Sequence, residues 1–214
     1  MSTTAKRPKS RPETLAKRRE ILRAATEVFG SKGFTNGTLA DIADQVGMTH
    51  AGILHHFGSK DQLLMEVLTY RDQTDVADLE EQHIPGGIEL FRHLVRTAFA
   101  NAQRAGIVQA FVVLSGESVT DAHPAQRYFA ERYRTLRGEV IEAFGVVCAE
   151  RGIDPAADVV AHAANAIIAV MDGLQVQWLH EPEAVELAEA TEFAIEAIVA
   201  AVLDPRPPFV RTNV

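Results

Sequence analysis

Residues 38–57, TLADIADQVGMTHAGILHHF, predict two short helices joined by a tight turn at Gly47-Met48. In each predicted helix, apolar residues recur at the spacing that places them on one face, where they would be buried. These residues are Leu39, Ile42, Ala43 and Val46 in the first helix, and Ile53, Leu54 and Phe57 in the second. The spacing is typical of a helix-turn-helix, whose second helix enters the major groove of DNA. The stretch therefore predicts a protein that reads DNA and is not an enzyme.

The charge of the chain is divided unevenly along its length. The formal net charge of −8 at pH 7 argues at first against a nucleic-acid partner. However, residues 1–60 contain ten Lys or Arg and five Asp or Glu, a balance of +5, whereas residues 61–214 contain eleven and twenty-four, a balance of −13. Electrostatic affinity for DNA depends on the local basic face, because salt screens charges beyond roughly 10 Å. The asymmetry favours a basic DNA-binding end attached to an acidic body.

The length of 214 residues allows one or two domains, and 47% hydrophobic and 23% charged residues are ordinary globular values. The longest apolar stretch, 159–179, contains His162, Asn165 and Asp172. A bilayer span would have to bury these polar groups, so a buried helix or an interface is favoured and no membrane partner is expected. Cys148 is the only cysteine, which excludes an intrachain disulfide. This cysteine usage and the lack of an apolar N-terminal signal region predict a cytoplasmic protein.

The periodicity of the whole chain predicts an all-α fold of about nine helices with no convincing strand. Residues 1–12 are a predicted basic tail, either a solubilising leader or an arm that contacts phosphates or the minor groove. Residues 13–60 form the predicted DNA-binding domain, and residues 61–214 form the body. The apolar residues 107–119 would also suit a buried strand, but no partner strand is found, so a helix is predicted. The predicted helices span about 13–32, 38–46, 49–56, 59–81, 88–104, 107–119, 121–151, 154–180 and 183–203.

Several helix boundaries carry recognisable signals. Thr38 is a predicted N-cap with Asp41 at the capping-box position, and Ser59 is a predicted cap of the helix that follows the motif. Gly33 follows a lysine and predicts the end of the first helix. Asp154-Pro155 predicts an N-cap followed by a proline in the first turn of a helix.

The predicted recognition helix, about 49–56, offers small and polar residues for contact with DNA. Its N-terminal residues enter the groove first, and histidine can donate to or accept from base edges. Gly52 would allow close approach of the backbone to DNA, although it could also be only a residue of low helix propensity. Phosphate contacts are expected from a helix cap and a nearby lysine. The predicted DNA-binding residues are Thr38, Thr49, His50, Gly52, His55, His56 and Lys60.

The string from Ile21 through Leu64 resembles the TetR-type transcriptional regulators. The resemblance rests on the helix ILRAATEVFGSKGF, followed in order by Thr38-Leu39, Asp41-Ile42-Ala43, Val46-Gly47-Met48-Thr49, Phe57, Ser59-Lys60 and Leu63. Farther along the chain, His123-Pro124 and Met171-Asp172-Gly173-Leu174 are similar to features of the family's C-terminal domain.

Two positions depart from the pattern of the family. Leu54 stands where the family usually has a tyrosine, whose hydroxyl helps to hold the DNA backbone. That contact is either lost or passes to His55 or His56. Ala40 stands where relatives often have an arginine, so a second backbone contact would be absent. Neither departure changes the core pattern, so the expected fold is unaffected.

The resemblance implies that the body, residues 61–214, dimerises and binds a small, largely apolar effector. Dimerisation is also expected because one recognition helix presents few base contacts, whereas a two-fold dimer reads a palindrome. The expected dimer interface is formed by Val159, Ala163, Ile167, Val170, Leu174, Ala194, Ala197 and Ala201. The expected effector pocket is lined by Phe91, Phe99, Phe111, Tyr133, His162, Asn165 and Trp178. For each of these residues taken singly, a place in the intramolecular core is the alternative.

The sequence thus predicts a regulator that binds double-stranded DNA as a homodimer, most often as a repressor in this family, and is released by an effector. No cofactor is expected, and the motif histidines do not predict a metal site, because 50 to 55 is a five-residue step and adjacent side chains point apart. The alternatives are an all-helical enzyme or carrier and a helical adaptor protein. Glu117 and His123 are the nearest approach to an acid–base pair, but each is interpreted as a turn or cap residue. Neither alternative accounts for the division of charge.

Overall fold

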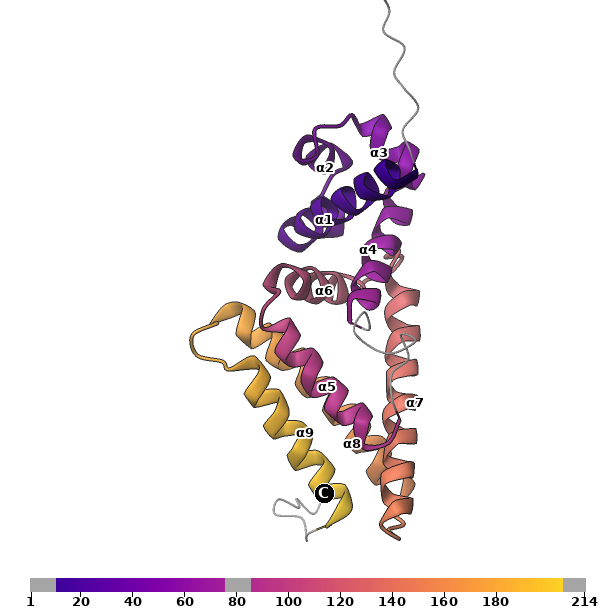
Figure 1. The fold of residues 1–214 in the computed structure, drawn as a ribbon, viewed down its shortest axis with the longest axis vertical. Coiled ribbons are helices and arrows are strands. Elements are labelled where there is room, and N and C mark those ends of the chain that lie inside the picture. Colours follow the sequence, from indigo (N-terminus) through magenta and orange to yellow (C-terminus); the bar gives the residue numbers. More distant parts are fainter. Residues whose placement is uncertain (1–10, 76–85, 206–214) are drawn as a thin grey trace, which may run out of the picture. The chain divides into compact units, whose positions relative to one another are not determined.

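The computed structural model describes residues 11–75 and 86–205, and these contain nine helices and no strand (Figure 1). The helices are α1 (Arg11–Asn36), α2 (Leu39–Gln45), α3 (His50–Phe57), α4 (Lys60–Asp75), α5 (Ile88–Asn101), α6 (Ala105–Glu117), α7 (Gln126–Glu150), α8 (Ala157–His180) and α9 (Leu187–Leu203). The all-α prediction is confirmed, including the helix chosen for the apolar residues that form α6. The predicted end of the fourth helix near residue 81 lies outside the described residues.

The chain divides into two compact units. The first contains the described residues through Thr74 together with Gln109–Ala125, and the second contains the described residues of Asp75–Val108 and of the chain from Gln126 onward. α4 through Thr74 and the part of α6 from Gln109 onward belong to the same compact unit as α1, α2 and α3. This unit extends beyond residues 13–60, and the predicted bounds of the DNA-binding domain stay a prediction.

In the first unit, the apolar faces of the helices pack against one another. α1 packs on α2, and α2 packs on α3. The fully buried large side chains of this unit include Phe29, Ile21, Ile42, Ile53, Leu63, Leu64 and Leu114. Gly33 interrupts α1 with φ 74° and ψ 173°, which is the helix end that its glycine predicts, although helical residues continue to Asn36. A Cβ at Gly33 would overlap the carboxylate of Glu117, which is the end of a flexible side chain, so the positive φ is the feature that requires glycine.

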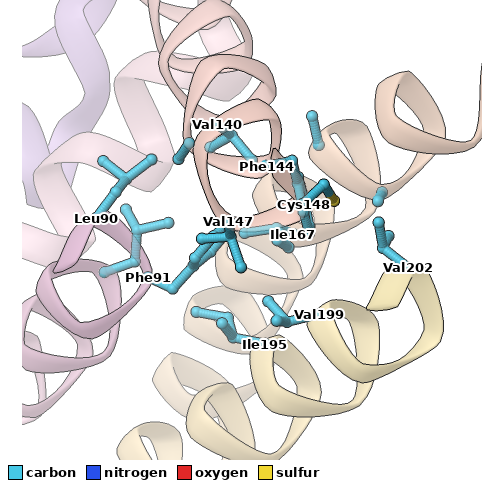
Figure 2. Close-up of a cluster of buried hydrophobic side chains, with 14 residues drawn as sticks. Leu90, Phe91, Val140, Phe144, Val147, Cys148, Ile167, Ile195, Val199 and Val202 are labelled. Atoms are coloured by element: carbon cyan, nitrogen blue, oxygen red, sulfur yellow. The ribbon is translucent and has the colours of Figure 1, made fainter. Parts of the chain in front are cut away.

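The second unit is held together by a core between α5, α7, α8 and α9 (Figure 2). Figure 2 shows side chains from these helices converging, with Phe91 of α5 directed toward α7. The ring centroids of Phe91 and Phe144 lie 4.7 Å apart, a distance suited to an aromatic pair. Cys148, the single cysteine of the chain, is buried in this cluster. The other members are Leu90, Leu94, Val140, Ala143, Val147, Ala163, Ala164, Ile167, Ile195, Val199 and Val202.

Three predicted helix starts are wrong. α9 begins at Leu187 and not near residue 183, because residues 182–184 form a turn. α8 begins at Ala157 after the N-cap Ala156, which makes no side-chain cap bond, so Asp154-Pro155 lies in the preceding loop. A proline restricts its own φ and the residue before it, but it does not require a helix to start there. α7 begins at Gln126 and not near residue 121, because residues 118–125 form turns in which Ala122 has a φ of 61°.

Among the described helices, α8 is the single one that is long and apolar enough to cross a membrane. This is weak evidence for a membrane span, because core helices of soluble proteins meet the same criteria. Ala163, Ala164, Ile167 and Ile168 of this helix are buried against the rest of the unit. This burial supports the prediction that the apolar stretch is a core or interface helix.

Candidate DNA-binding and effector sites

The helix-turn-helix consists of α2 and α3, and a side-chain cap defines the start of each helix. Thr38 Oγ1 accepts a hydrogen bond from the Asp41 amide at 3.1 Å, and the Asp41 carboxylate accepts one from the Thr38 amide at 3.0 Å. Thr49 Oγ1 accepts a hydrogen bond from the Gly52 amide at 3.1 Å. These bonds satisfy amide groups that have no partner within the first turn of a helix. The structure therefore confirms the predicted capping box at α2.

The Asp41 carboxylate also joins α2 to α1. Nζ of Lys32, near the end of α1, lies 2.7 Å from Asp41 Oδ1. The hydrogen bond from Lys32, and then those from Thr38, hold the pKa of Asp41 well below its usual range. The ionised form of this carboxylate is therefore the form that the fold requires.

α3 presents an accessible polar surface. Thr49, His50 and His55 are exposed, whereas Ile53 and Phe57 are buried. These three predicted DNA contacts are thus accessible to solvent, and their contact with DNA stays a prediction. Thr38 at the start of α2 is exposed as well. Leu54, which the sequence predicted to be buried, is only half-buried.

Gly52 and His56 are less accessible than the other predicted DNA contacts. A Cβ at Gly52 would lie 2.9 Å from Cε of Met48, the end of a flexible side chain that can move aside, so packing inside the protein does not by itself require glycine there. His56 is half-buried, and its carbonyl oxygen accepts a hydrogen bond from Arg18. Within residues 11–75 and 86–205, no three His, Cys, Asp or Glu residues are grouped so that they could hold a metal ion.

Lys17 and Arg18 of α1 donate hydrogen bonds to backbone carbonyl groups of the helix-turn-helix. The sequence analysis predicted neither contact. Lys17 Nζ donates to the carbonyl oxygen of Val46 at 2.8 Å. Arg18 donates to the carbonyl oxygen of His56 and to the carboxylate of Glu66 in α4. No sequence signal distinguishes these residues, because they follow a basic tail and resemble the solvated cations around them.

Lys60, a predicted phosphate contact, is engaged within the protein. Its ammonium donates to the carbonyl oxygen of Phe34 and, at 3.4 Å, to that of Thr35. The same ammonium lies 4.4 Å from the centroid of the Phe34 ring. Burial lowers the pKa of Lys60, while the charges of Asp61 and Glu117 oppose that change. Lys60 therefore holds the last residues of α1, and phosphate binding by this residue stays a prediction.

Glu117 and His123 lie close together in the first unit, but both serve packing. Glu117 Oε2 accepts a hydrogen bond from the Phe34 amide at 2.6 Å, and His123 Nε2 lies 3.9 Å from the same oxygen. His123 Nδ1 accepts a hydrogen bond from the Ala125 amide at 3.2 Å. The rings of Phe34 and His123 meet edge to face with centroids 5.3 Å apart. These contacts attach the end of α6 and the turn that follows it to the last residues of α1.

In the second unit, α5 and α9 border a groove of about 530 Å³. This volume lies within the range of small-molecule sites. The groove brings together Phe91 and Phe99, two of the predicted effector contacts. Its other lining residues are the apolar Ile88, Val95, Ile195 and Val199 and the charged Arg92, Arg96, Glu192 and Glu196. The groove therefore combines an apolar floor with cations on α5 and carboxylates on α9.

The other predicted effector residues lie elsewhere. Trp178 is buried on α8, whereas His162 and Asn165 are exposed on the same helix. Tyr133 of α7 is half-buried, and Phe111 belongs to the first unit. Among the described residues, the predicted set therefore does not line one groove, because aromatic residues at helical spacing serve the core and a ligand site equally well.

The predicted dimer residues divide into a buried set and an accessible set. Ala163 and Ile167 are buried in the core of the second unit, where they serve folding and offer no accessible surface. The exposed residues are Val159, Ala197 and Ala201, and the half-buried residues are Val170, Leu174 and Ala194. The sequence prediction missed Phe193 of α9, whose side chain is 75% exposed, because glutamates surround it in the sequence.

Comparison with known proteins identifies similar sequences at both ends of the chain. The family profile described as "Bacterial regulatory proteins, tetR family" matches residues 21–67, and the profile "BetI-type transcriptional repressor, C-terminal" matches residues 87–204. The chain is 35% identical over 91 residues to the HTH-type transcriptional repressor AcnR of Corynebacterium jeikeium, which covers 42% of this chain and 47% of that protein. The match therefore spans less than half the length of this relative.

Solved structures share the fold at low sequence identity. The SmeT–triclosan complex has a TM-score of 0.67 and 20% identity, and the comparison covers 91% of this chain and 96% of that chain. FadR from Bacillus subtilis, solved with stearoyl-CoA, has a TM-score of 0.70 and 16% identity, covering 86% of this chain and 98% of that chain. At these identities the likeness establishes the fold alone.

Proposed function

Because the chain belongs to the TetR family of bacterial regulatory proteins, we propose that it is a cytoplasmic repressor that binds a palindromic DNA operator as a dimer and is released by a small effector. The observation that carries this proposal is the exposed polar surface of α3, which is capped at its start by Thr49. A short helix with a polar N-terminal end suits the major groove, whose base edges offer donors and acceptors.

His50 is the proposed base-reading residue, since it is the exposed first residue of α3. Thr38 and Thr49 are proposed to face phosphates from the starts of α2 and α3, where helix dipoles favour anions. His55 is exposed in the last turn of α3 and is the proposed substitute for the backbone contact missing at Leu54. Phosphate contacts would set the register of the protein on the duplex, and base contacts would select the sequence.

A second copy is proposed to pack against the accessible apolar residues of α8 and α9. Val159 and Val176 on α8 are 41% and 39% exposed, and Phe193 on α9 is 75% exposed. Exposed alanines nearby, Ala197 and Ala201, would allow close approach between helices. A two-fold dimer would present two copies of α3 to half-sites one helical turn, about 34 Å, apart.

The effector is proposed to be largely apolar, with a polar group. The α5–α9 groove supports this class, since Phe91 and Phe99 line its floor and charged side chains flank it. FadR, which shares the fold, was solved with stearoyl-CoA, a ligand with a long acyl chain. Release from DNA requires only that the effector bind one arrangement of the dimer more tightly than the other, and its coupling energy equals that difference.

Selection of duplexes from a random-sequence pool tests the proposed function. The protein should enrich a palindromic sequence, and its affinity for that operator should fall as the salt concentration rises, because counterions are released on binding. His50→Ala should change which bases are enriched in each half-site, since it removes a base contact worth about 1–3 kcal/mol of discrimination. The matched control is His180→Ala, which removes an exposed histidine at the end of α8. This variant should enrich the same DNA sequence as the wild-type protein. A wild-type protein that enriches no sequence and binds no duplex at low salt would overturn the proposal.

A further inference from the structure

α1 provides cationic caps for the C-terminal ends of both helices of the helix-turn-helix. The last carbonyl groups of a helix have no partner within it, and a cation placed there also meets the negative end of the helix dipole. Lys17 Nζ lies 2.8 Å from the carbonyl oxygen of Val46, the C-cap of α2. Arg18 donates to the carbonyl oxygen of His56 in the last turn of α3. Two adjacent side chains of one helix therefore hold the ends of two others.

Arg18 makes the more extensive contacts of the two. Its Nη2 lies 2.5 Å from Oε1 of Glu66 in α4, and its guanidinium carbon lies 4.3 Å from the centroid of the Phe57 ring. A planar guanidinium can donate in its own plane to an oxygen while its face stacks on an aromatic ring, which an ammonium cannot do with the same geometry. Arg18 thus joins α1, α3 and α4 through one side chain.

These contacts distinguish Arg18 from the solvated cations near it. Its side chain is 28% exposed, and the carboxylate of Glu66 lies against its guanidinium. Arg19 and Arg23, on the same helix, are exposed. The inward contacts of Arg18 oppose a role as a phosphate ligand, because its donors are directed to a carbonyl group and a carboxylate.

We propose that Arg18 is a positioning residue for DNA recognition: it sets the orientation of α3 against α1 and α4, and thereby operator selectivity, without touching DNA. The proposal rests on the proposed function, because it assumes that α3 reads the operator. α3 has eight residues, and its buried side chains are Ile53 and Phe57. Contact by Arg18 with both the Phe57 ring and the end of the α3 backbone therefore restrains tilt of the helix. Binding groups must be held within about 0.5 Å of their productive geometry to be effective.

Glu66→Ala separates positioning from phosphate binding. If Arg18 bound phosphate, removal of the neighbouring carboxylate would free the guanidinium and strengthen binding to every duplex. If Arg18 positions α3, removal of its anchor in α4 weakens binding to the operator. We expect Glu66→Ala and Arg18→Ala each to weaken operator binding about ten-fold, the typical effect of losing a charge-assisted hydrogen bond. Glu27→Ala, which removes an exposed carboxylate of α1, is the control and should not weaken it.

Arg18→Lys tests whether positive charge alone is sufficient. Lysine keeps the charge but cannot reach the carbonyl group and the carboxylate with one planar fork, so it should recover only part of the lost affinity. Full recovery by Arg18→Lys would overturn the proposal, because it would reduce the role of Arg18 to charge.

The measurement is fluorescence anisotropy with the full chain, on the operator duplex selected by the wild-type protein and on a random duplex. Circular dichroism and thermal melting establish that each variant is folded. A fall in the ratio of operator to random affinity in both Arg18→Ala and Glu66→Ala supports the proposal. An unchanged ratio, or tighter binding of both duplexes by Glu66→Ala, overturns it. If Arg18→Ala does not fold, Glu66→Ala and Arg18→Lys decide the question. A wild-type protein that selects no operator would instead overturn the proposed function.

Discussion

The carboxylate of Asp41 contacts three groups of the first unit. It accepts hydrogen bonds from the amide and the hydroxyl of Thr38 and pairs with Lys32 of α1. Because the ionised form makes these bonds, the pKa of Asp41 is lowered, with the bond from Lys32 as the largest cause. A carboxyl group whose pKa is lower in the folded than in the unfolded chain stabilises the fold above its unfolded pKa. That stabilisation is lost as the pH falls through the folded value.

Asp41→Asn should therefore lower the thermal unfolding midpoint of the protein at neutral pH. Asparagine can still accept the hydrogen bond from the Thr38 amide, but it cannot pair with the Lys32 ammonium as an ion. The difference in midpoint from the wild type should begin to shrink as the pH falls below about 4, the ordinary pKa of an aspartate, because the unfolded chain then binds a proton that the folded carboxyl does not. It disappears when the folded carboxyl is also protonated and the ion pair with Lys32 is lost. Thermal melts at low ionic strength between neutral and acidic pH would measure this difference. Asp44→Asn, at an exposed position of α2, is the control. A difference that is independent of pH would contradict the role of the charge.

At the scale of helices, the first unit depends on the close approach of α1 and α6. A Cβ at Gly30 of α1 would lie 3.2 Å from both Cα and N of Ala110 in α6. Backbone atoms cannot move aside as the end of a flexible side chain can, so the absence of a side chain at Gly30 permits this crossing. Glycine within a helix costs about 1 kcal/mol relative to alanine, and here the cost has a packing reason.

Gly30→Leu should destabilise the first unit by about 1–3 kcal/mol, because it overpacks the contact between α1 and α6. Gly116→Leu is a matched control on the exposed side of α6, where no atom lies within 4 Å of the position of a Cβ. The control should be neutral or stabilising by up to about 1 kcal/mol through helix propensity. Urea denaturation followed by circular dichroism would measure both effects, and equal losses in the two variants would contradict the packing argument.

The sequence predicts the helices of the fold well where periodicity and capping agree. Thr38 and Asp41 form the expected capping box, and the apolar residues of α6 form the expected helix. Contacts between distant elements escape prediction, because sequence spacing reports only which residues share a face. The caps that Arg18 provides for α3 and the crossing at Gly30 are of this kind.

For the candidate sites, too, the sequence indicates features that depend on one helix but not features that depend on contacts between distant helices. His50 and His55 are exposed, as the local pattern of α3 allows, and their contact with DNA stays a prediction. By contrast, Phe91 and Phe111 look alike in sequence, yet one lines a groove of the second unit and the other packs under Arg71 in the first. Burial of Ile167 inside the core, in a helix apolar on several faces, likewise depends on which helices surround it.

For the whole molecule, the proposed dimer makes Phe193 a sensitive position. Its side chain is 75% exposed on α9, and large exposed aromatic residues are typical anchors of interfaces. Phe193→Glu should shift the protein toward a monomer, since it would place a charge where a second copy packs. Sedimentation velocity over a range of protein concentrations would measure the shift. Affinity for a palindromic operator should fall with it, because a monomer reads one half-site.

Val119→Glu is the matched control for this experiment. Val119 is 81% exposed, but it lies in the first unit and not on α8 or α9. The Val119→Glu substitution should leave the sedimentation behaviour unchanged. A Phe193→Glu protein that sediments as the wild type does would move the proposed interface away from α9.

The burial of Cys148 has a practical consequence for spectroscopy. Reagents that modify thiols need an accessible thiolate, and the only native thiol of this chain lies inside the core of the second unit. In the folded protein, the native thiol should therefore react little with spin labels and fluorophores. A cysteine introduced at an exposed site, as in His55→Cys, would carry one probe per chain without replacement of the native thiol. Distances between such probes in paired copies would then report directly on the separation of the two recognition helices, with and without an effector.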